Sequence, residues 1–307
     1  MRALVATGDT TGPLTLQEVD PPTPATSETV VEVKACSINR GELRLLASRP
    51  RGWRPGQDIA GVVAEPAADG NGPPAGTRVV ALVDQAGWAE RVAVPRSRLA
   101  VLPDSVSFQA AATLPVAGLT ALRALRLGGT LLGKAVLVTG ASGGVGHFAV
   151  QLAAHSGARV TGVSRNPDRG LGLRDAGDVR LVSSVESAGG PFDLILESVG
   201  GASLTASLKA VAPDGTVALF GNSSGEDSSV SFASFGGRPR ARLYAFFVYE
   251  SGEPPTFGAD LALLANEIAA GRLHPQVGLE ASWRNPVDAL RMLRERQLEG
   301  KAVLLVD

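Results

Sequence analysis

A glycine-rich turn near the middle of the chain has the residue types and spacing needed to bind a pyrophosphate. The segment Val136-Leu-Val-Thr-Gly140-Ala-Ser-Gly143-Gly144-Val-Gly146 indicates a buried strand, a turn and a helix start. Backbone N–H groups at a helix N-terminus attract an anion, and Gly143 and Gly146 present no Cβ that would block its approach. Because a strand–helix–strand pattern surrounds the turn, we interpret it as a dinucleotide site; an ordinary glycine-rich turn is the alternative. The expected contacts are Ser142, Gly143, Gly144 and Val145.

A second group of polar residues follows the next expected strand. At this position a carboxylate would favour the ribose 2′-hydroxyl of NAD, but the chain has Ser164, Arg165 and Asn166, with Arg169 close behind. An arginine suits a 2′-phosphate because its planar guanidinium makes charge-assisted, bidentate hydrogen bonds. These residues therefore predict NADPH as the cofactor, bound in part by Ser164, Arg165 and Arg169. A solvated loop face is the alternative.

These loops require a parallel sheet to position them. After about residue 110, apolar runs typical of buried parallel strands alternate with helical patterns, which predicts a doubly wound α/β (Rossmann) domain. We expect strands at 135–139, 159–163, 194–197 and 217–221, and helices at 147–156 and 203–211. Residues 1–103 instead show short β-rich runs separated by proline and glycine, which predicts a mostly β domain. We expect strands there at 29–37, 59–64, 78–83 and 88–94, and a helix at 40–47. The C-terminal part should form helices at 259–270 and 286–295 and a strand at 302–306.

Composition narrows the class of partner. The net charge is −1, and without a basic run the 307-residue chain lacks the electrostatic pattern that favours nucleic acid or a membrane surface. No apolar run is long enough to span a bilayer, and no signal-peptide pattern is present. A single cysteine, Cys36, excludes an internal disulfide framework. We therefore expect a cytoplasmic protein with a small-molecule partner.

Several further motifs resemble one protein family. They are ATLPVAGLTA (112–121), FGNSSG (220–225), VKACSIN (33–39), PGQDIAG (55–61), ESVGG (197–201) and GKAVL (300–304). Together with the glycine turn, they resemble the quinone oxidoreductase branch of the medium-chain dehydrogenase/reductase superfamily over nearly the whole chain. The resemblance implies a GroES-like catalytic domain of residues 1–116 and 271–307, and a Rossmann NADPH-binding domain of residues 117–270.

The resemblance also implies that this chain lacks a metal site. At the positions where zinc-dependent alcohol dehydrogenases of the superfamily carry Cys, His and Cys ligands, it has Asn39, Gln57 and Val116. Neither an amide nor an isopropyl group can replace a thiolate or imidazole, so we expect no bound zinc. Cys36 lies three residues before the ligand position and is expected to be a buried, inert thiol. The histidines, His147, His155 and His274, are expected on helix surfaces or loops.

By the same resemblance, Asn39 and Thr120 are the expected catalytic residues beside the nicotinamide. The loop residues expected to bind the cofactor are Val199, Gly221, Asn222, Ser223, Phe246, Phe247 and Val248. Without a Lewis acid, the favoured reaction is hydride transfer from NADPH to an activated acceptor such as a quinone or an α,β-unsaturated carbonyl. No tyrosine occurs at 42–46, so water is a candidate proton source.

Two alternative functions remain open. The chain is alternatively an enoyl reductase acting on a thioester or a biosynthetic intermediate, or a non-catalytic NADPH-binding protein.

The apolar runs 217–220 and 230–235 lie near an expected sheet edge. Because unpaired edge strands favour strand addition, we also expect a homodimer joined through the nucleotide domains.

Overall fold

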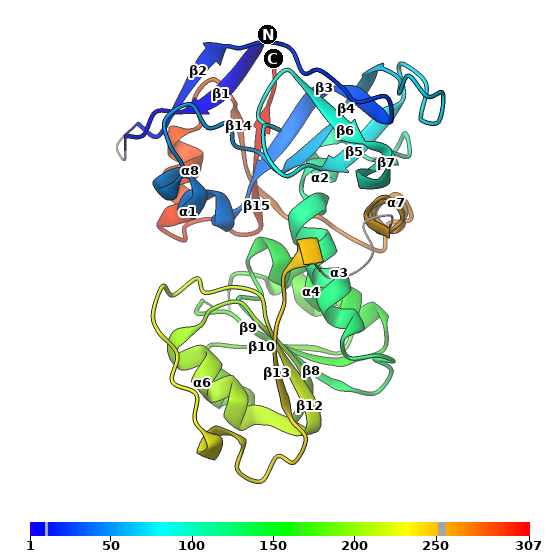
Figure 1. Cartoon of the computed structure of the whole chain (residues 1–307). Helices are drawn as coiled ribbons and strands as arrows, with labels where there is room; N and C mark the ends of the chain where they lie inside the picture. The colour runs from blue at the N-terminus through cyan, green and yellow to red at the C-terminus, as the bar shows by residue number, and fades with distance from the viewer. Residues whose placement is uncertain (10–11, 167, 251–255) are drawn as a thin grey trace. The chain divides into compact units, whose positions relative to one another are not determined.

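The computed structural model describes residues 1–9, 12–166, 168–250 and 256–307, which form two compact units (Figure 1). The first unit comprises Met1–Leu119 and Gly252–Asp307, and the second comprises Thr120–Ser251. The second unit contains a parallel sheet, and the first is mostly β. The fold class expected from the sequence is therefore confirmed.

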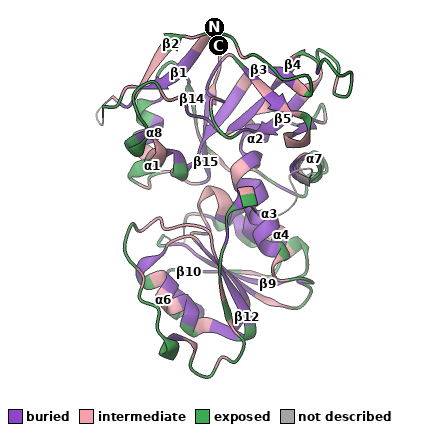
Figure 2. Ribbon diagram, viewed as in Figure 1, coloured by how far each residue is buried: buried purple, intermediate pink, exposed green. Residues whose placement is uncertain are grey.

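The sheet of the second unit has six parallel strands in the order β10-β9-β8-β11-β12-β13. Their bounds are β8 (Ala135–Thr139), β9 (Arg159–Val163), β10 (Val179–Val182), β11 (Phe192–Glu197), β12 (Val211–Leu219) and β13 (Arg242–Ala245). The central strands of this sheet are largely buried (Figure 2), and Leu137 and Ile195 are fully buried. A sheet buried on both faces explains why these strands appear as continuous apolar runs in the sequence.

Helices cover both faces of this sheet. They are α3 (Leu119–Arg126), α4 (Gly144–His155), α5 (Val185–Ala188) and α6 (Gly201–Ala210), and α4 and α6 lie on opposite faces in Figure 1. The chain runs outward from β8 to β9 and β10, then returns to the centre and runs the other way from β11 to β13. Because parallel crossovers are right-handed, this reversal places the two sets of connections on opposite faces. The reversal between β8 and β11 is the position where doubly wound sheets bind ligands.

The first unit is built on a seven-stranded sheet in the order β14-β15-β3-β4-β5-β7, in which β6 also pairs with β3; β1 and β2 form a separate pair. The strands are β1 (Arg2–Ala6), β2 (Leu14–Glu18), β3 (Glu28–Ile38), β4 (Asp58–Glu65), β5 (Arg78–Leu82), β6 (Arg91–Pro95), β7 (Leu99–Val101), β14 (Val277–Ser282) and β15 (Lys301–Leu305). Trp88 and Trp283 are fully buried in its core. The unit therefore depends on strands from both parts of the chain.

Helices α1 (Arg40–Ser48), α2 (Phe108–Ala112), α7 (Thr256–Ala269) and α8 (Val287–Arg294), with a π-helical turn at Leu114–Gly118, complete the first unit. The expected domain boundary at residue 270 differs from the structure, which groups α7 with the first unit. The reason is local packing: a Cβ on Gly258 would lie 2.6 Å from the carbonyl oxygen of Leu99, so the backbone of α7 lies directly against β7. Phe257 and Leu261 of α7 are buried.

Several strands of the structure were not predicted from the sequence patterns. Among the described residues, the strands that were not expected are β1, β2, β7, β10, β13 and β14. The run Val217–Phe220 also does not lie at an edge, since β12 pairs with both β11 and β13 and the edge strand is β13. None of the described helices has the length and apolar character needed to cross a bilayer.

Candidate cofactor and active site

Every residue assigned from the sequence to the cofactor in the second unit lies just beyond the carboxyl end of a parallel strand. The phosphate loop follows β8, Ser164 to Arg169 follow β9, Val199 follows β11, Gly221 to Ser223 follow β12, and Phe246 to Val248 follow β13. Because the strands are parallel, these ends share one edge of the sheet. The fold therefore brings five separate sequence segments to one edge.

The phosphate loop makes the transition from strand to helix in four residues. Gly140 has a φ of +64°, a conformation that favours glycine, and Gly143 is the extended N-cap residue of α4. The N–H groups of Gly144 and Val145 lie in the first turn, where no intrahelical acceptor is available, so they can donate to an anion. This arrangement suits the pyrophosphate of a dinucleotide.

Gly146 has a different role from the one expected. A Cβ there would lie 2.2 Å from the carbonyl oxygen of Gly140 and 2.7 Å from the Cα of Ala141. The missing side chain thus allows α4 to pack against its own loop, and it does not provide clearance for the ligand. For Gly143, the nearest atom to an added Cβ is the carbonyl oxygen of Gly140 at 3.2 Å, which is tight but not prohibitive.

The loops after β8 and β9 are linked through two hydroxyls. Ser142 Oγ and Ser164 Oγ lie 3.1 Å apart, and Ser164 Oγ donates to the carbonyl oxygen of Asn166 at 2.8 Å. Ser164 is buried, Arg165 is exposed and Arg169 is partly buried. Ser164 therefore orders the loop, whereas the exposed Arg165 guanidinium is accessible to a charged ligand.

Glu197, which the sequence reasoning did not single out, builds the turn that carries Val199. Its carboxylate is fully buried, and Oε1 accepts from the N–H groups of Val199 at 2.7 Å and Gly200 at 2.9 Å. Oε2 accepts from the hydroxyls of Ser203 at 3.0 Å and Ser207 at 2.9 Å. These four bonds fix the turn after β11. An acidic residue at the end of an apolar strand, followed by small residues, was the available sequence signal.

The loop after β12 is tied to that turn. Ser223 N donates to Ser198 O at 3.0 Å, and a Cβ on Gly221 would lie 2.9 Å from the same oxygen. Asn222 uses its side chain inside the loop, where Oδ1 accepts from Ser224 Oγ at 2.9 Å and Nδ2 donates to Glu226 O at 3.1 Å. Asn222 thus shapes the loop with its carboxamide, and Gly221 permits the close approach of two backbones.

The three apolar residues after β13 do not behave alike. Phe246 and Val248 are 3% and 6% exposed, whereas Phe247 is 64% exposed. The side chain of Phe247 is therefore available for contact with a ligand or a partner, and the other two pack within the protein.

In the first unit, Asn39 belongs to a buried polar network. Its Nδ2 donates to Asp58 Oδ2 at 2.8 Å, and Lys301 Nζ donates to both Asn39 Oδ1 and, at 3.0 Å, Asp58 Oδ2. Ser37 Oγ also donates to Asp58 Oδ2 at 2.6 Å, and the N–H of Val116 donates to Asp58 Oδ1 at 2.8 Å. The other expected catalytic residue, Thr120, is buried in α3 of the second unit. Asn39 and Thr120 are assigned to a common site by the family resemblance alone.

Beside this network, Glu42 has a carboxyl group with an altered affinity for protons. Burial, and then the negative charge of Asp58, raise the pKa of Glu42 from 4.5 to about 8, even though Oε2 accepts from the N–H of Asn39 at 2.7 Å. Glu42 and Asn39 form a capping box at the start of α1. Near neutral pH, Glu42 is therefore mainly a neutral acid.

Cys36 and His147 are both buried. Cys36 is a fully buried free thiol, and burial, with the charges of Glu42 and Asp58, raises its pKa well above the usual value. The expected burial of this thiol is thus confirmed, and its lack of reactivity stays a prediction. The expectation of a surface position for His147 is wrong: the ring is buried in α4, with Nδ1 2.9 Å from Gln151 Nε2. Within the described ranges, no three His, Cys, Asp or Glu side chains are grouped as metal ligands.

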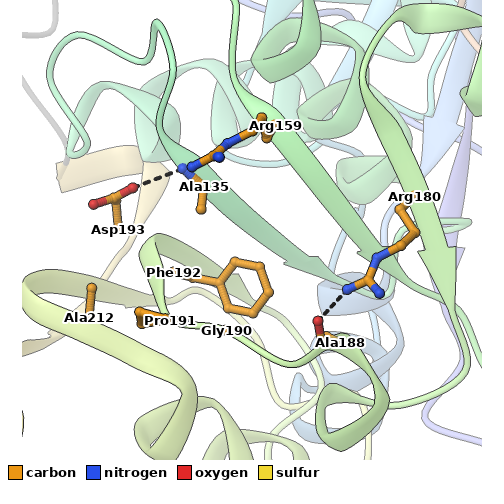
Figure 3. Close-up of a pocket in the computed structure, with 9 residues that line it drawn as sticks. All are labelled: Ala135, Arg159, Arg180, Ala188, Gly190, Pro191, Phe192, Asp193 and Ala212. Carbon is orange, nitrogen blue, oxygen red and sulfur yellow. Dashed lines mark hydrogen bonds between the residues drawn. The ribbon is translucent and has the colours of Figure 1, made fainter.

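A surface hollow of the second unit lies at the opposite edge of the sheet from the cofactor loops (Figure 3). It is lined where strands begin, by Ala135 of β8, Arg159 of β9, Arg180 of β10 and Phe192 of β11. Asp193 accepts from the N–H of Ala135 at 2.8 Å, and Arg180 donates to Ala188 O. These bonds link β11 to β8 and β10 to α5, and the hollow does not belong to the candidate cofactor site.

Comparisons with known proteins agree with this architecture. Residues 144–266 match the family model described as zinc-binding dehydrogenase. The chain is 35% identical over 207 residues to the chloroplastic quinone-oxidoreductase homolog of Spinacia oleracea, which covers 60% of this chain and 63% of that relative. It is 33% identical over 286 residues to the spectinabilin polyketide synthase system protein NorB of Streptomyces orinoci, covering 89% of this chain and 13% of that relative.

Among solved structures, mycobacterial Rv1454c complexed with NADPH superposes with a TM-score of 0.86 at 25% identity, covering 99% of this chain and 100% of that chain. The chain spans less than two thirds of the length of the first curated relatives that it matches. The family model matches none of Asn39, Gln57 and Val116, which all precede residue 144.

A doubly wound sheet, with a phosphate loop at its point of reversal, defines the second unit as a Rossmann-type dinucleotide-binding domain. The chain is similar to members of the medium-chain dehydrogenase/reductase superfamily, and to quinone oxidoreductases in particular.

Proposed function

We propose that the chain is a zinc-independent, NADPH-dependent reductase that transfers hydride to a quinone or an α,β-unsaturated carbonyl compound. The observation that carries this proposal is the exposed Arg165, which follows β9 at the edge that also presents the phosphate loop. A relative with the same fold, Rv1454c, is complexed with NADPH. When bound, NADPH would supply a hydride to the acceptor carbon, while a proton is added to the substrate from water or a side chain.

The proposal gives a role to each of the following site residues. The N–H groups of Gly144 and Val145 bind the pyrophosphate, and Arg165 with Arg169 binds the 2′-phosphate. Val199, on the turn fixed by Glu197, and the loop Gly221–Ser223 position the nicotinamide. Asn39 and Thr120 contact the nicotinamide or the acceptor.

The activity is tested by following NADPH absorbance with a panel of quinones, enones and acyl thioesters. Oxidation with quinones or simple enones, at a higher kcat/KM than with thioesters, supports the proposal. A preference for enoyl thioesters would favour the second candidate, an enoyl reductase, which the similarity to a polyketide synthase supports. Tight NADPH binding without oxidation by any acceptor would indicate a non-catalytic binding protein.

We expect the purified protein to contain no stoichiometric zinc and to keep its activity in chelator. The reason is chemical: Asn39, Gln57 and Val116 cannot form a thiolate and imidazole ligand set. Elemental analysis together with an assay before and after chelation tests this. One zinc per chain, lost together with activity, would reverse the assignment.

We also expect a homodimer formed through the second unit. Its edge strand β13 pairs with β12 alone among the described strands. Phe232, in the apolar run 230–235 expected near this interface, is 96% exposed and so accessible to a second copy of the chain. Sedimentation at micromolar concentration should give a dimer, and Phe232→Asp should weaken it. Leu132→Asp, at another exposed apolar residue, serves as the control and should leave the dimer intact. A monomeric wild-type protein would refute the expectation.

A further inference from the structure

A buried ion pair in the first unit has no role in the function described so far. Lys301 and Asp58 have side chains only 5% and 0% exposed, and their Nζ and Oδ2 atoms lie 3.0 Å apart. Removing two charges from water is costly, and a buried pair often contributes little or nothing to net stability. We therefore expect the pair to orient a neighbouring group.

That group is the carboxamide of Asn39. A carboxylate can only accept a hydrogen bond and an ammonium can only donate one, so the two charges together fix which end of the amide faces which partner. Asn39 Nδ2 donates to Asp58 Oδ2 at 2.8 Å, and Asn39 Oδ1 accepts from Lys301 Nζ. Turning the amide by 180° would set oxygen against carboxylate and nitrogen against ammonium. The Asn39 backbone is held as well, because its N–H donates to Glu42 Oε2 at 2.7 Å.

One hydrogen atom of the Asn39 carboxamide remains for another partner. The amide nitrogen has two N–H bonds, and Asp58 accepts only one of them. An ammonium on the amide oxygen draws electron density from the nitrogen, which makes the second N–H a stronger hydrogen-bond donor. Asn39 is 8% exposed, so the residue is not completely closed off.

We propose that Lys301 and Asp58 are positioning residues that lock and polarise the Asn39 carboxamide, so that its second N–H donates to the oxygen of the acceptor as negative charge develops there. The inference rests on the proposed function, in which Asn39 contacts the nicotinamide or the acceptor. No bond is made or broken at Lys301 or Asp58; they act through Asn39 alone. A donor fixed in advance stabilises the developing charge without reorganisation during the reaction.

A purely structural role is the competing explanation. Asp58 links the ends of β3 and β4, the π-helical turn and, through Lys301, β15, so its loss could simply loosen the unit. The experiment must therefore separate stability from the state of the Asn39 amide and from turnover.

The decisive variant is Lys301→Met, which keeps an unbranched apolar stem and removes the donor. Its kcat with the best acceptor should fall about tenfold to a hundredfold, while the Kd for NADPH stays unchanged. Asn39→Ala should lose a similar amount, and the double variant should lose no more than the worse single variant, because both remove one donor. Lys34→Met, at a half-exposed lysine on β3, is the matched control and should keep wild-type kcat.

A second readout does not depend on activity. In protein labelled with ¹⁵N-asparagine, the side-chain resonances of Asn39, identified by their loss in Asn39→Ala, should shift in Lys301→Met and stay in place in Lys34→Met. If Lys301→Met alone fails to fold, Lys301→Met combined with Asp58→Asn removes both charges and leaves no unpaired one.

Unchanged Asn39 resonances in a folded Lys301 variant, wild-type kcat in that variant, or additive losses in the double variant with Asn39→Ala would each overturn the inference. If the wild-type protein reduces no acceptor, the proposed function fails, whereas the resonance shift still decides whether Lys301 holds the Asn39 amide.

Discussion

Replacing Arg165 with aspartate is expected to weaken NADPH binding by about tenfold to a hundredfold and to leave NADH binding unchanged or slightly improved. The substitution removes a charge-assisted hydrogen bond and places a carboxylate near a dianionic phosphate, a loss of about 1.5–3 kcal/mol. Arg165 is exposed at the end of β9, so the change should not disturb the fold. The measurement is the ratio of kcat/KM for NADPH to that for NADH, with one fixed quinone.

Arg159 offers a matched control for this substitution. It is an exposed arginine at the start of the same strand, at the opposite edge of the sheet, so Arg159→Asp makes the same charge change away from the cofactor loops. Its cofactor ratio should remain that of the wild type. Arg169 also lies in the loop, and the variant with both Arg165 and Arg169 replaced should show the upper end of the loss. If the wild type prefers NADH, or if Arg165→Asp leaves the ratio unchanged, the assignment of Arg165 to the 2′-phosphate is wrong.

The second large effect is expected from Glu42→Gln, in the dependence of stability on pH. The folded protein raises the pKa of Glu42 from 4.5 to about 8, so it binds that proton more tightly than the unfolded chain does. The resulting stabilisation is fully present below pH 4.5 and is lost as pH rises through about 8, with an upper limit of about 5 kcal/mol. Glutamine keeps an oxygen for the N–H of Asn39 but cannot ionise, so this contribution to the pH dependence should disappear.

Chemical denaturation of both proteins between pH 5 and pH 9 measures the effect. The wild type should lose stability across this range relative to Glu42→Gln, and the difference should favour the variant most at the alkaline end. Glu18→Gln, at an exposed residue of β2, is the control and should follow the wild-type curve. Parallel curves for the wild type and Glu42→Gln would mean that Glu42 is ionised in the folded protein.

The sequence was most informative where function depends on local backbone. The conformation of the turn from Gly140 to Gly146 depends on residues that are neighbours in the sequence. The apolar run of the next strand, β9, indicates that Arg165 follows the end of that strand. Parallel pairing of the strands brings the loops that follow them to one edge of the sheet. The cofactor residues predicted in separate segments of the sequence therefore lie at the same edge.

Contacts between residues far apart in the chain could not be anticipated in the same way. Lys301 meets Asp58 across 243 positions of sequence, and neither residue has a periodicity or motif that would indicate the pairing. The assignment of α7 failed for a similar reason, because an apolar helix indicates burial without indicating which sheet it covers. The role of Gly146 was misjudged because a missing Cβ can admit either a ligand or another part of the backbone.

The return of the chain to the first unit has a consequence for biosynthesis. β3 pairs along one side with β15, which follows β7 by roughly 200 residues, a stretch that takes about 10–40 s to translate. Until then, the part of β3 that will face β15 has no strand partner on that side, whereas the second unit has been completed in one continuous stretch. The first unit, whose synthesis starts first, is therefore the last to be completed. A ribosome stalled shortly before residue 301 would carry a folded nucleotide domain and a first unit with an incomplete sheet.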